Sequence, residues 1–213
     1  HLSIRRQRQM GIRDRGWVLR VSAGRGGTAG ILLRELRRVD RDYPEQHLDV
    51  ARKFTELSDT DLARHERERA ATRAVLACVS PAPAWPLPLD RPVAGRVTSD
   101  FGLRRFFNGE AKKPHSGVDL AGARGTPVLA CADGVVTLAD DHFFSGRSVY
   151  VDHGAGVQSM YFHFTEIHVE PGQVVERGEV LGTVGDSGRV TGPHLHWGLS
   201  VLGQLVDPLP LVE

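Results

Sequence analysis

The fold of this 213-residue chain is constrained most by a succession of short β-prone segments that begins after Pro92 and continues to the C-terminus. Turn signals separate the segments, among them Ala-Asp-Gly at 132–134, Pro-Gly at 171–172 and Gly-Asp-Ser-Gly at 185–188. Many short strands at regular spacing, without helices between them, predict an antiparallel all-β domain. We expect strands at 95–99, 117–120, 127–130, 134–139, 148–153, 157–164, 173–175, 180–185 and 195–200.

One helix is predicted upstream of this domain, over residues 58–79. Ser58 or Asp59 can cap its N-terminus, and acidic residues crowd its first turn, where they suit the helix dipole. Its apolar residues form a narrow stripe at Leu62, Ala70, Ala74 and Ala77.

A proline-rich linker is predicted at 80–92, where five prolines exclude both a helix and a central strand. Before the helix, residues 1–57 contain the apolar segments 17–21 and 31–36 around a glycine cluster. They predict a small β-rich accessory module with a long hairpin loop, and 43–54 offers one more strand. The chain is therefore predicted to contain an accessory module at 1–57, a helix at 58–79, a linker at 80–92 and a C-terminal domain at 93–213.

Charge and composition exclude some classes of protein. The net charge of +1 gives no reason to expect a nucleic-acid partner. Residues 1–80 nevertheless carry 17 Lys+Arg against 11 Asp+Glu, whereas 81–213 carry 10 against 15, which favours two modules. No run approaches the roughly 18 apolar residues of a transmembrane helix. The chain starts at His1 without a leader, so we expect that any signal or anchor has been removed.

Three further residues are expected to have structural roles. Cys78 and Cys131 lie in apolar runs and have no metal-type spacing, so we expect both to be buried as small hydrophobic side chains. His153 lies in a turn-like Asp-His-Gly sequence, where a histidine commonly forms hydrogen bonds within the fold.

Two pairs of residues suit a metal site. His194 and His196 flank Leu195, and residues two apart in a strand point to the same face. His115 and Asp119 form the second pair, in PHSGVDL. Three ligands drawn from these four leave a fourth position of zinc for water and one histidine spare for acid–base work. His163, in SMYFHF on the same predicted strand face as Tyr161, is a further acid–base candidate.

From Thr98 onward the chain resembles the lysostaphin/LytM-type family of peptidoglycan zinc endopeptidases. The resemblance runs through SDFGLRR, HSGVD, GTPVLACADGVV, the His-Gly turn, MYFHF, VEPGQVVERGEVLGTVG, GPHLHWG and the VDP near the C-terminus. RRFFNG at 104–109 is similar to a branch of the family found in Gram-negative bacteria. The helix and the preceding YPEQHLDV resemble the accessory region that such proteins carry before the peptidase domain.

The resemblance implies a fold and a set of site residues. The fold is mainly β, with a C-terminal antiparallel β-sheet peptidase domain of the lysostaphin/LytM type, preceded by a small β-rich module and one helix. One zinc ion per chain is held by His115, Asp119 and His196, and His163 and His194 are the catalytic histidines.

The implied function is zinc-dependent hydrolysis of peptide cross-links in the cell wall, with the D-alanyl–diaminopimelate bond as the expected target. The expected partners are peptidoglycan stem peptides and an envelope protein, and the expected location is the periplasm or cell envelope. The alternative is a non-catalytic or latent protein that binds or activates other cell-wall hydrolases. A lipoyl-type carrier is disfavoured because no lysine follows Lys113.

Overall fold

The structure of the chain is a computed structural model with two compact units, His1–Asp42 and Tyr43–Glu213. The residues that it describes are 2–3, 17–22, 31–36, 42–52, 56–81 and 87–212.

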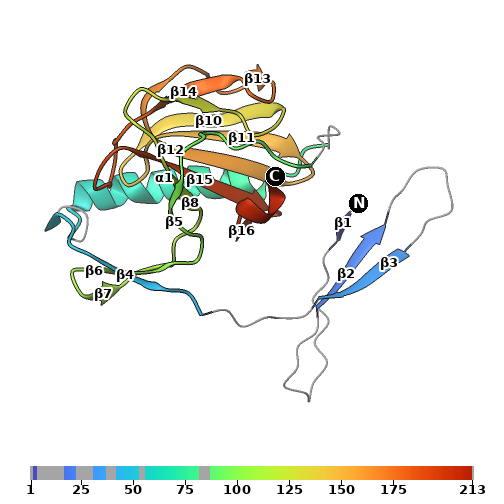
Figure 1. Cartoon of the computed structure of the whole chain (residues 1–213), viewed down its shortest axis with the longest axis horizontal. Coiled ribbons are helices and arrows are strands. Elements are labelled where there is room, and N and C mark those ends of the chain that lie inside the picture. Colours follow the sequence, from blue (N-terminus) through green and yellow to red (C-terminus); the bar gives the residue numbers. More distant parts are fainter. Residues whose placement is uncertain are drawn as a thin grey trace, which may run out of the picture. The chain divides into compact units, whose positions relative to one another are not determined.

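The smaller unit contains one antiparallel sheet of three strands in the order β1-β2-β3 (Figure 1). Strand β1 is Leu2–Ser3, β2 is Trp17–Ser22 and β3 is Ile31–Leu36. The two strands predicted here are therefore confirmed. The glycine cluster predicted to form their hairpin loop lies outside the described residues.

The larger unit is built on a ten-stranded sheet in which the order β13-β10-β11-β12-β15-β8-β5 forms the main path (Figure 1). Strand β14 leaves this path to pair with β12 and β9, and β16 pairs with β15. All these pairings are antiparallel, as predicted. The strands are β5 (Val97–Ser99), β8 (Val118–Ala121), β9 (Pro127–Leu129), β10 (Gly134–His142), β11 (Gly146–Gly154), β12 (Val157–Ile167), β13 (Val174–Val175), β14 (Val180–Val184), β15 (His194–Val201) and β16 (Gln204–Val206).

A second sheet of this unit was not predicted. Strand β6 (Arg104–Phe107) lies between β7 (Glu110–Ala111) and β4 (Glu45–Leu48), and it is parallel to β4. Asn108 and Gly109 connect β6 to β7 with φ angles of 51° and 84°. Two consecutive positive φ angles suit an Asn-Gly hairpin turn, a signal that was present in the sequence. Because β4 pairs with β6, the larger unit begins near residue 43, before the expected boundary at 57.

Helix α1 (Asp59–Ala77) agrees with the prediction of a helix at 58–79. The Ser58 hydroxyl accepts a hydrogen bond from the backbone N–H of Asp61 at 3.1 Å and so caps the helix. The apolar stripe does not make a packed face, however, because no residue of α1 is buried and Leu62 is 45% exposed. Polar contacts hold α1 beside the large sheet (Figure 1), one of which joins Thr72 to the Tyr150 hydroxyl at 3.3 Å.

The end of the predicted linker is part of the folded unit. Leu89 is buried and forms a bridge with Val212. The N–H of Asp90 donates to the carbonyl of Cys131 at 2.9 Å. Residues 87–92 therefore attach the chain to the core of the larger unit. A short 3₁₀ helix, Leu209–Leu211, lies near the C-terminus. The functional division into module, linker and peptidase domain stays a prediction.

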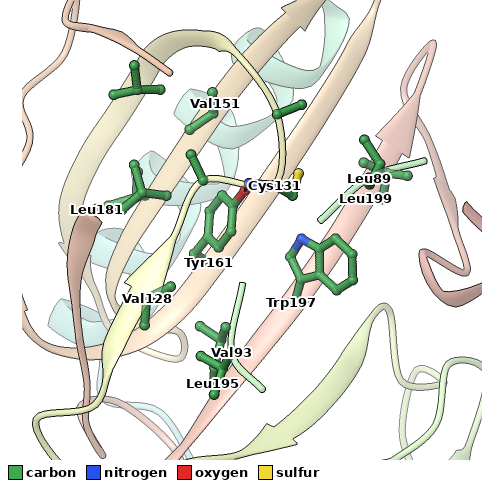
Figure 2. Close-up of a cluster of buried hydrophobic side chains, with 14 of the residues drawn as sticks. Leu89, Val93, Val128, Cys131, Val151, Tyr161, Leu181, Leu195, Trp197 and Leu199 are labelled. Carbon is green, nitrogen blue, oxygen red and sulfur yellow. Dashed lines mark hydrogen bonds between the residues drawn. The ribbon is translucent and has the colours of Figure 1, made fainter. Parts of the chain in front are cut away.

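The core is formed largely by side chains of the large sheet, and Trp197 and Tyr161, both fully buried, are its largest members (Figure 2). The Tyr161 hydroxyl accepts a hydrogen bond from the N–H of Cys131 at 3.0 Å. His153 is buried and bonded to the Asp133 carbonyl at 2.7 Å, as its turn sequence indicated. The prediction for Cys78 was wrong: it is exposed, because it caps the C-terminus of a helix that buries no residue. Among the described residues no helix is long and apolar enough to cross a membrane.

Candidate metal centre

Two neighbouring strands bring a carboxylate and two imidazoles to one point. Asp119 lies on β8 and is the register partner of His196 on β15. His115 precedes β8, and its backbone N–H donates to the Leu103 carbonyl at 2.9 Å. All three side chains are buried. Ionisable side chains are rarely buried unless they pair with one another or coordinate a metal.

The three side chains offer one ligand atom each to a common position. Nε2 of His115, Nδ1 of His196 and Oδ1 of Asp119 lie 2.9 Å from one another along each side of the triangle. Two imidazole nitrogens and one carboxylate oxygen are a common protein ligand set for zinc. Among the described residues this is the one cluster of this kind.

The tautomer of His115 fits a metal ligand. Its Nδ1 lies 2.9 Å from the Asp100 carbonyl oxygen, which can only accept a hydrogen bond, so Nδ1 carries the proton. In the neutral ring Nε2 then presents a lone pair toward Oδ1 of Asp119. A lone pair and a carboxylate oxygen at 2.9 Å repel each other unless a cation lies between them. A ring nitrogen fixed by a carbonyl in this way is typical of metal-binding histidines.

Asp119 is held ionised and oriented. Burial by itself raises the pKa of its carboxyl, but the hydrogen bonds and positive charge that His115 and His196 supply when they are protonated outweigh that effect and hold the pKa well below its usual range. The other carboxylate oxygen, Oδ2, accepts a hydrogen bond from the Arg105 guanidinium at 2.9 Å. Arg105 is in turn bonded to Gln46 on β4 at 3.2 Å. The second sheet therefore holds Asp119 through Oδ2, whereas the two histidines contact Oδ1.

His163 reaches the site through a β-bulge in β12. Arg147 pairs with Phe164 and Ser148 with Phe162, so His163 is the extra residue on its strand, with φ of 72°. The prediction that His163 shares a face with Tyr161 was wrong for this reason. Tyr161 points into the core, whereas the His163 ring lies 5.0 Å from the ring of His194. A positive φ at a non-glycine residue stores strain, and strain of this kind clusters at functional sites.

The rings of His163 and His194 are each fixed by a backbone carbonyl. Nδ1 of His163 donates to the Ser187 carbonyl at 2.9 Å, and Nδ1 of His194 donates to the Gly192 carbonyl at 2.8 Å. Both Nε2 atoms can therefore accept a proton. Burial, together with His194 and His196, lowers the pKa of His163 to about 3. His194 lies outside the ligand triangle, since its Nε2 is 3.8 Å from Oδ1 of Asp119.

All five predicted site residues thus lie together, and the structure adds others that the sequence analysis missed. Arg105 and Gln46 support Asp119, and Ser187 supports His163. The Arg-Arg pair of SDFGLRR contributes to the family resemblance. Nothing in the sequence shows which arginine faces inward, and the contact of Arg105 with Gln46 spans 59 residues.

The site and fold define a metallopeptidase domain, and comparison with known proteins supports this class. Residues 113–208 match Peptidase family M23. The crystal structure of a putative peptidase M23 from Pseudomonas aeruginosa has 37% sequence identity and a TM-score of 0.73, and the alignment covers 95% of this chain and 75% of that one. This chain therefore belongs to peptidase family M23.

Relatives with assigned names share the C-terminal part of the chain. It is 41% identical over 115 residues to the peptidoglycan DD-endopeptidase ShyA of Vibrio cholerae, which is 54% of this chain and 27% of ShyA. It is 40% identical over 114 residues to the DD-carboxypeptidase/endopeptidase Mpg of Neisseria meningitidis, covering 54% of this chain and 26% of Mpg. A zinc containing peptidase from Vibrio cholerae superposes with a TM-score of 0.54 at 33% identity, over 57% of this chain and 39% of that one. The chain thus spans about a quarter of the length of the curated relatives that it matches.

Proposed function

We propose that this chain is a zinc-dependent endopeptidase that hydrolyses peptide cross-links of peptidoglycan, with the D-alanyl–diaminopimelate bond as its target. The observation that carries the proposal is the buried triangle of His115, Asp119 and His196 beside a second pair of histidines. The names of ShyA and Mpg support peptidoglycan as the substrate class.

The chain would hold one zinc ion through Nε2 of His115, Oδ1 of Asp119 and Nδ1 of His196. When bound there, zinc polarises the scissile carbonyl and lowers the pKa of a water molecule to about 7. The residues around it orient its ligands: the Asp100 carbonyl fixes the ring of His115, and Arg105 fixes the carboxylate of Asp119.

His163 and His194 would handle the protons of the reaction. With both Nδ1 atoms donating to carbonyls, the two Nε2 atoms face the reacting groups as proton acceptors. One accepts the proton of the attacking water and then delivers it to the leaving amine. The other, protonated beforehand from solvent, donates to the oxyanion of the tetrahedral intermediate, a contact whose loss typically costs about 10²–10³-fold in rate.

The biological setting follows from the substrate. Peptidoglycan lies outside the cytoplasm, so we propose a periplasmic or cell-envelope location, with stem peptides as the ligands and an envelope protein as a further partner. The alternative, a non-catalytic activator, is less well supported because the ligand set and both additional histidines are present.

Zinc content and hydrolysis separate the roles of the two groups of residues. We expect the full chain to contain one zinc ion and to release cross-linked peptides from purified peptidoglycan, in a reaction that a chelator stops. Asp119→Asn should lose both zinc and hydrolysis. His163→Asn should keep zinc and lose hydrolysis, and asparagine tolerates the positive φ at that position.

His168→Asn is a matched control, because His168 is an exposed histidine that follows β12, and its ring lies 3.5 Å from the Glu166 carboxylate. Zinc binding without hydrolysis in the wild-type chain would favour the activator. Full activity of His163→Asn would show that the catalytic assignment is wrong.

A further inference from the structure

Arg189 is held rigidly between two aromatic rings at the edge of the site. Its guanidinium carbon lies 4.6 Å from the centroid of Phe107 and 4.5 Å from that of Phe144. Its backbone N–H donates to the Phe144 carbonyl at 2.8 Å. The preceding Gly188 packs so closely that a Cβ atom there would lie 2.4 Å from the backbone nitrogen of Gly146. The plane of the guanidinium is therefore fixed before any ligand arrives.

The charge of Arg189 has no counter-ion in the described part of the chain. None of the described residues forms an ion pair or a side-chain hydrogen bond with its guanidinium, although the side chain is half-buried. Burial and the positive charge of Arg105 lower the pKa of Arg189 to about 10, so it remains a cation at neutral pH. A partly desolvated cation costs free energy unless an anion pairs with it. The five N–H donors of Arg189 are thus available to an anion from outside.

Two connections place Arg189 beside the ligand triangle. Phe107 is two residues after Arg105 on β6, so the two side chains share a strand face, and Arg105 bonds to Asp119. On the other side, Ser187 is two residues before Arg189, and its carbonyl accepts the hydrogen bond from His163. An anion bound by Arg189 would therefore lie on the side of the site that Arg105 and Ser187 support.

We propose that Arg189 binds a carboxylate of the stem peptide next to the scissile bond, an assignment that rests on the proposed function. A planar guanidinium pairs with a carboxylate through two parallel hydrogen bonds. On the C-terminal side of the cross-link, stem peptides offer two such groups, the C-terminal carboxylate of a D-alanine and the free carboxylate of diaminopimelate. Either would position the peptide and neutralise the unpaired charge.

The test uses a synthetic cross-linked pair of stem peptides in three forms: unmodified, amidated at the terminal carboxylate, and amidated at the diaminopimelate carboxylate. Arg189→Gln should lower kcat/KM on the unmodified peptide by about 10- to 100-fold, mainly through KM, with unchanged zinc content and unchanged circular dichroism. Arg189→Lys should recover part of this loss, because lysine keeps the charge but lacks the planar fork.

Amidation identifies the carboxylate. On the peptide whose recognised carboxylate is amidated, wild type and Arg189→Gln should be equally slow, whereas the other amidated peptide should still show the full loss. Arg104→Gln is the control. Arg104 lies on β6, the strand that carries Phe107, but its side chain is 56% exposed and pairs with Glu45 at 2.8 Å. It should cleave all three peptides at the wild-type rate.

The outcomes separate this proposal from the proposed function. Cleavage by the wild-type chain together with an undiminished rate for Arg189→Gln would overturn only the role of Arg189. An equal loss on all three peptides would overturn the proposal, because Arg189 would then bind neither of these two carboxylates. A zinc-loaded wild-type chain that cleaves none of the peptides and no purified peptidoglycan would overturn both proposals.

Discussion

Replacing Glu68 by alanine should release helix α1 from the turn that contains Phe143 and Phe144. The Glu68 carboxylate accepts the backbone N–H of Phe143 at 3.0 and 3.1 Å and the Nε of Arg64 at 2.6 Å, and its side chain is only 13% exposed. Because α1 buries no residue, its attachment depends on such polar contacts rather than on hydrophobic burial. The helix should therefore be sensitive to one substitution.

The expected loss follows from these contacts. The two oxygens share one N–H, so they count as one hydrogen bond to a charged group, which contributes about 1.5–3 kcal/mol. The Arg64 pair adds little, since the Arg64 side chain is 40% exposed and exposed pairs within a helix contribute about 0.3–0.5 kcal/mol. A change of this size raises the population of the open state by about 10- to 100-fold.

Hydrogen–deuterium exchange of the intact chain measures that population. The amides of α1 and of Phe143 should exchange about 10- to 100-fold faster in Glu68→Ala, while those of β11, β12 and β15 keep their wild-type rates. Glu66→Ala is the matched control, because Glu66 is an exposed acid on the same helix. Equal exchange at Phe143 in Glu68→Ala and Glu66→Ala would refute the view that Glu68 attaches the helix.

Three other substitutions test the core and the site. Tyr161→Phe should lower the free energy of unfolding by about 2 kcal/mol, or the melting temperature by roughly 4–8 °C, because it leaves the buried N–H of Cys131 without an acceptor. Gly117→Ala should weaken zinc binding in a chelator competition, because the new Cβ would lie 2.7 Å from Nε2 of His196. Burial raises the pKa of Tyr150 to about 12, above the value of about 10 in the unfolded chain, so its contribution to stability is complete below pH 10 and is lost as the pH rises to 12. Tyr150→Phe should therefore lose less stability over that interval than the wild-type chain does.

Each of these experiments has an internal comparison. Tyr150→Phe should cost less than Tyr161→Phe at neutral pH, because the partner Thr72 is not buried and can bind water instead. Gly192→Ala should leave zinc binding unchanged, since a Cβ there meets no atom within 4 Å. If Tyr161→Phe unfolds at the wild-type temperature, or Gly117→Ala binds zinc as tightly as wild type, the packing inferred at those positions is wrong.

Features set by neighbouring residues were predictable from the sequence. Alternation and turn signals located most strands of the large sheet, and the order of capping residues located α1, because both depend on backbone geometry over a few residues. The His-x-His spacing put His194 and His196 on one face for the same reason. The family resemblance, rather than spacing, indicated which of these two joins His115 and Asp119.

Only the tertiary structure decided features that depend on contacts between distant segments. The register of β8 against β15 places Asp119 opposite His196, 77 residues away in the chain, and the parallel pairing of β4 with β6 brings Gln46 to Arg105. The bulge at His163 depends on the pairing of β12 with β11, because His163 is an extra residue only relative to that neighbouring strand. These contacts are set by packing and register over the whole sheet, so they follow from the fold and from no local pattern of residues.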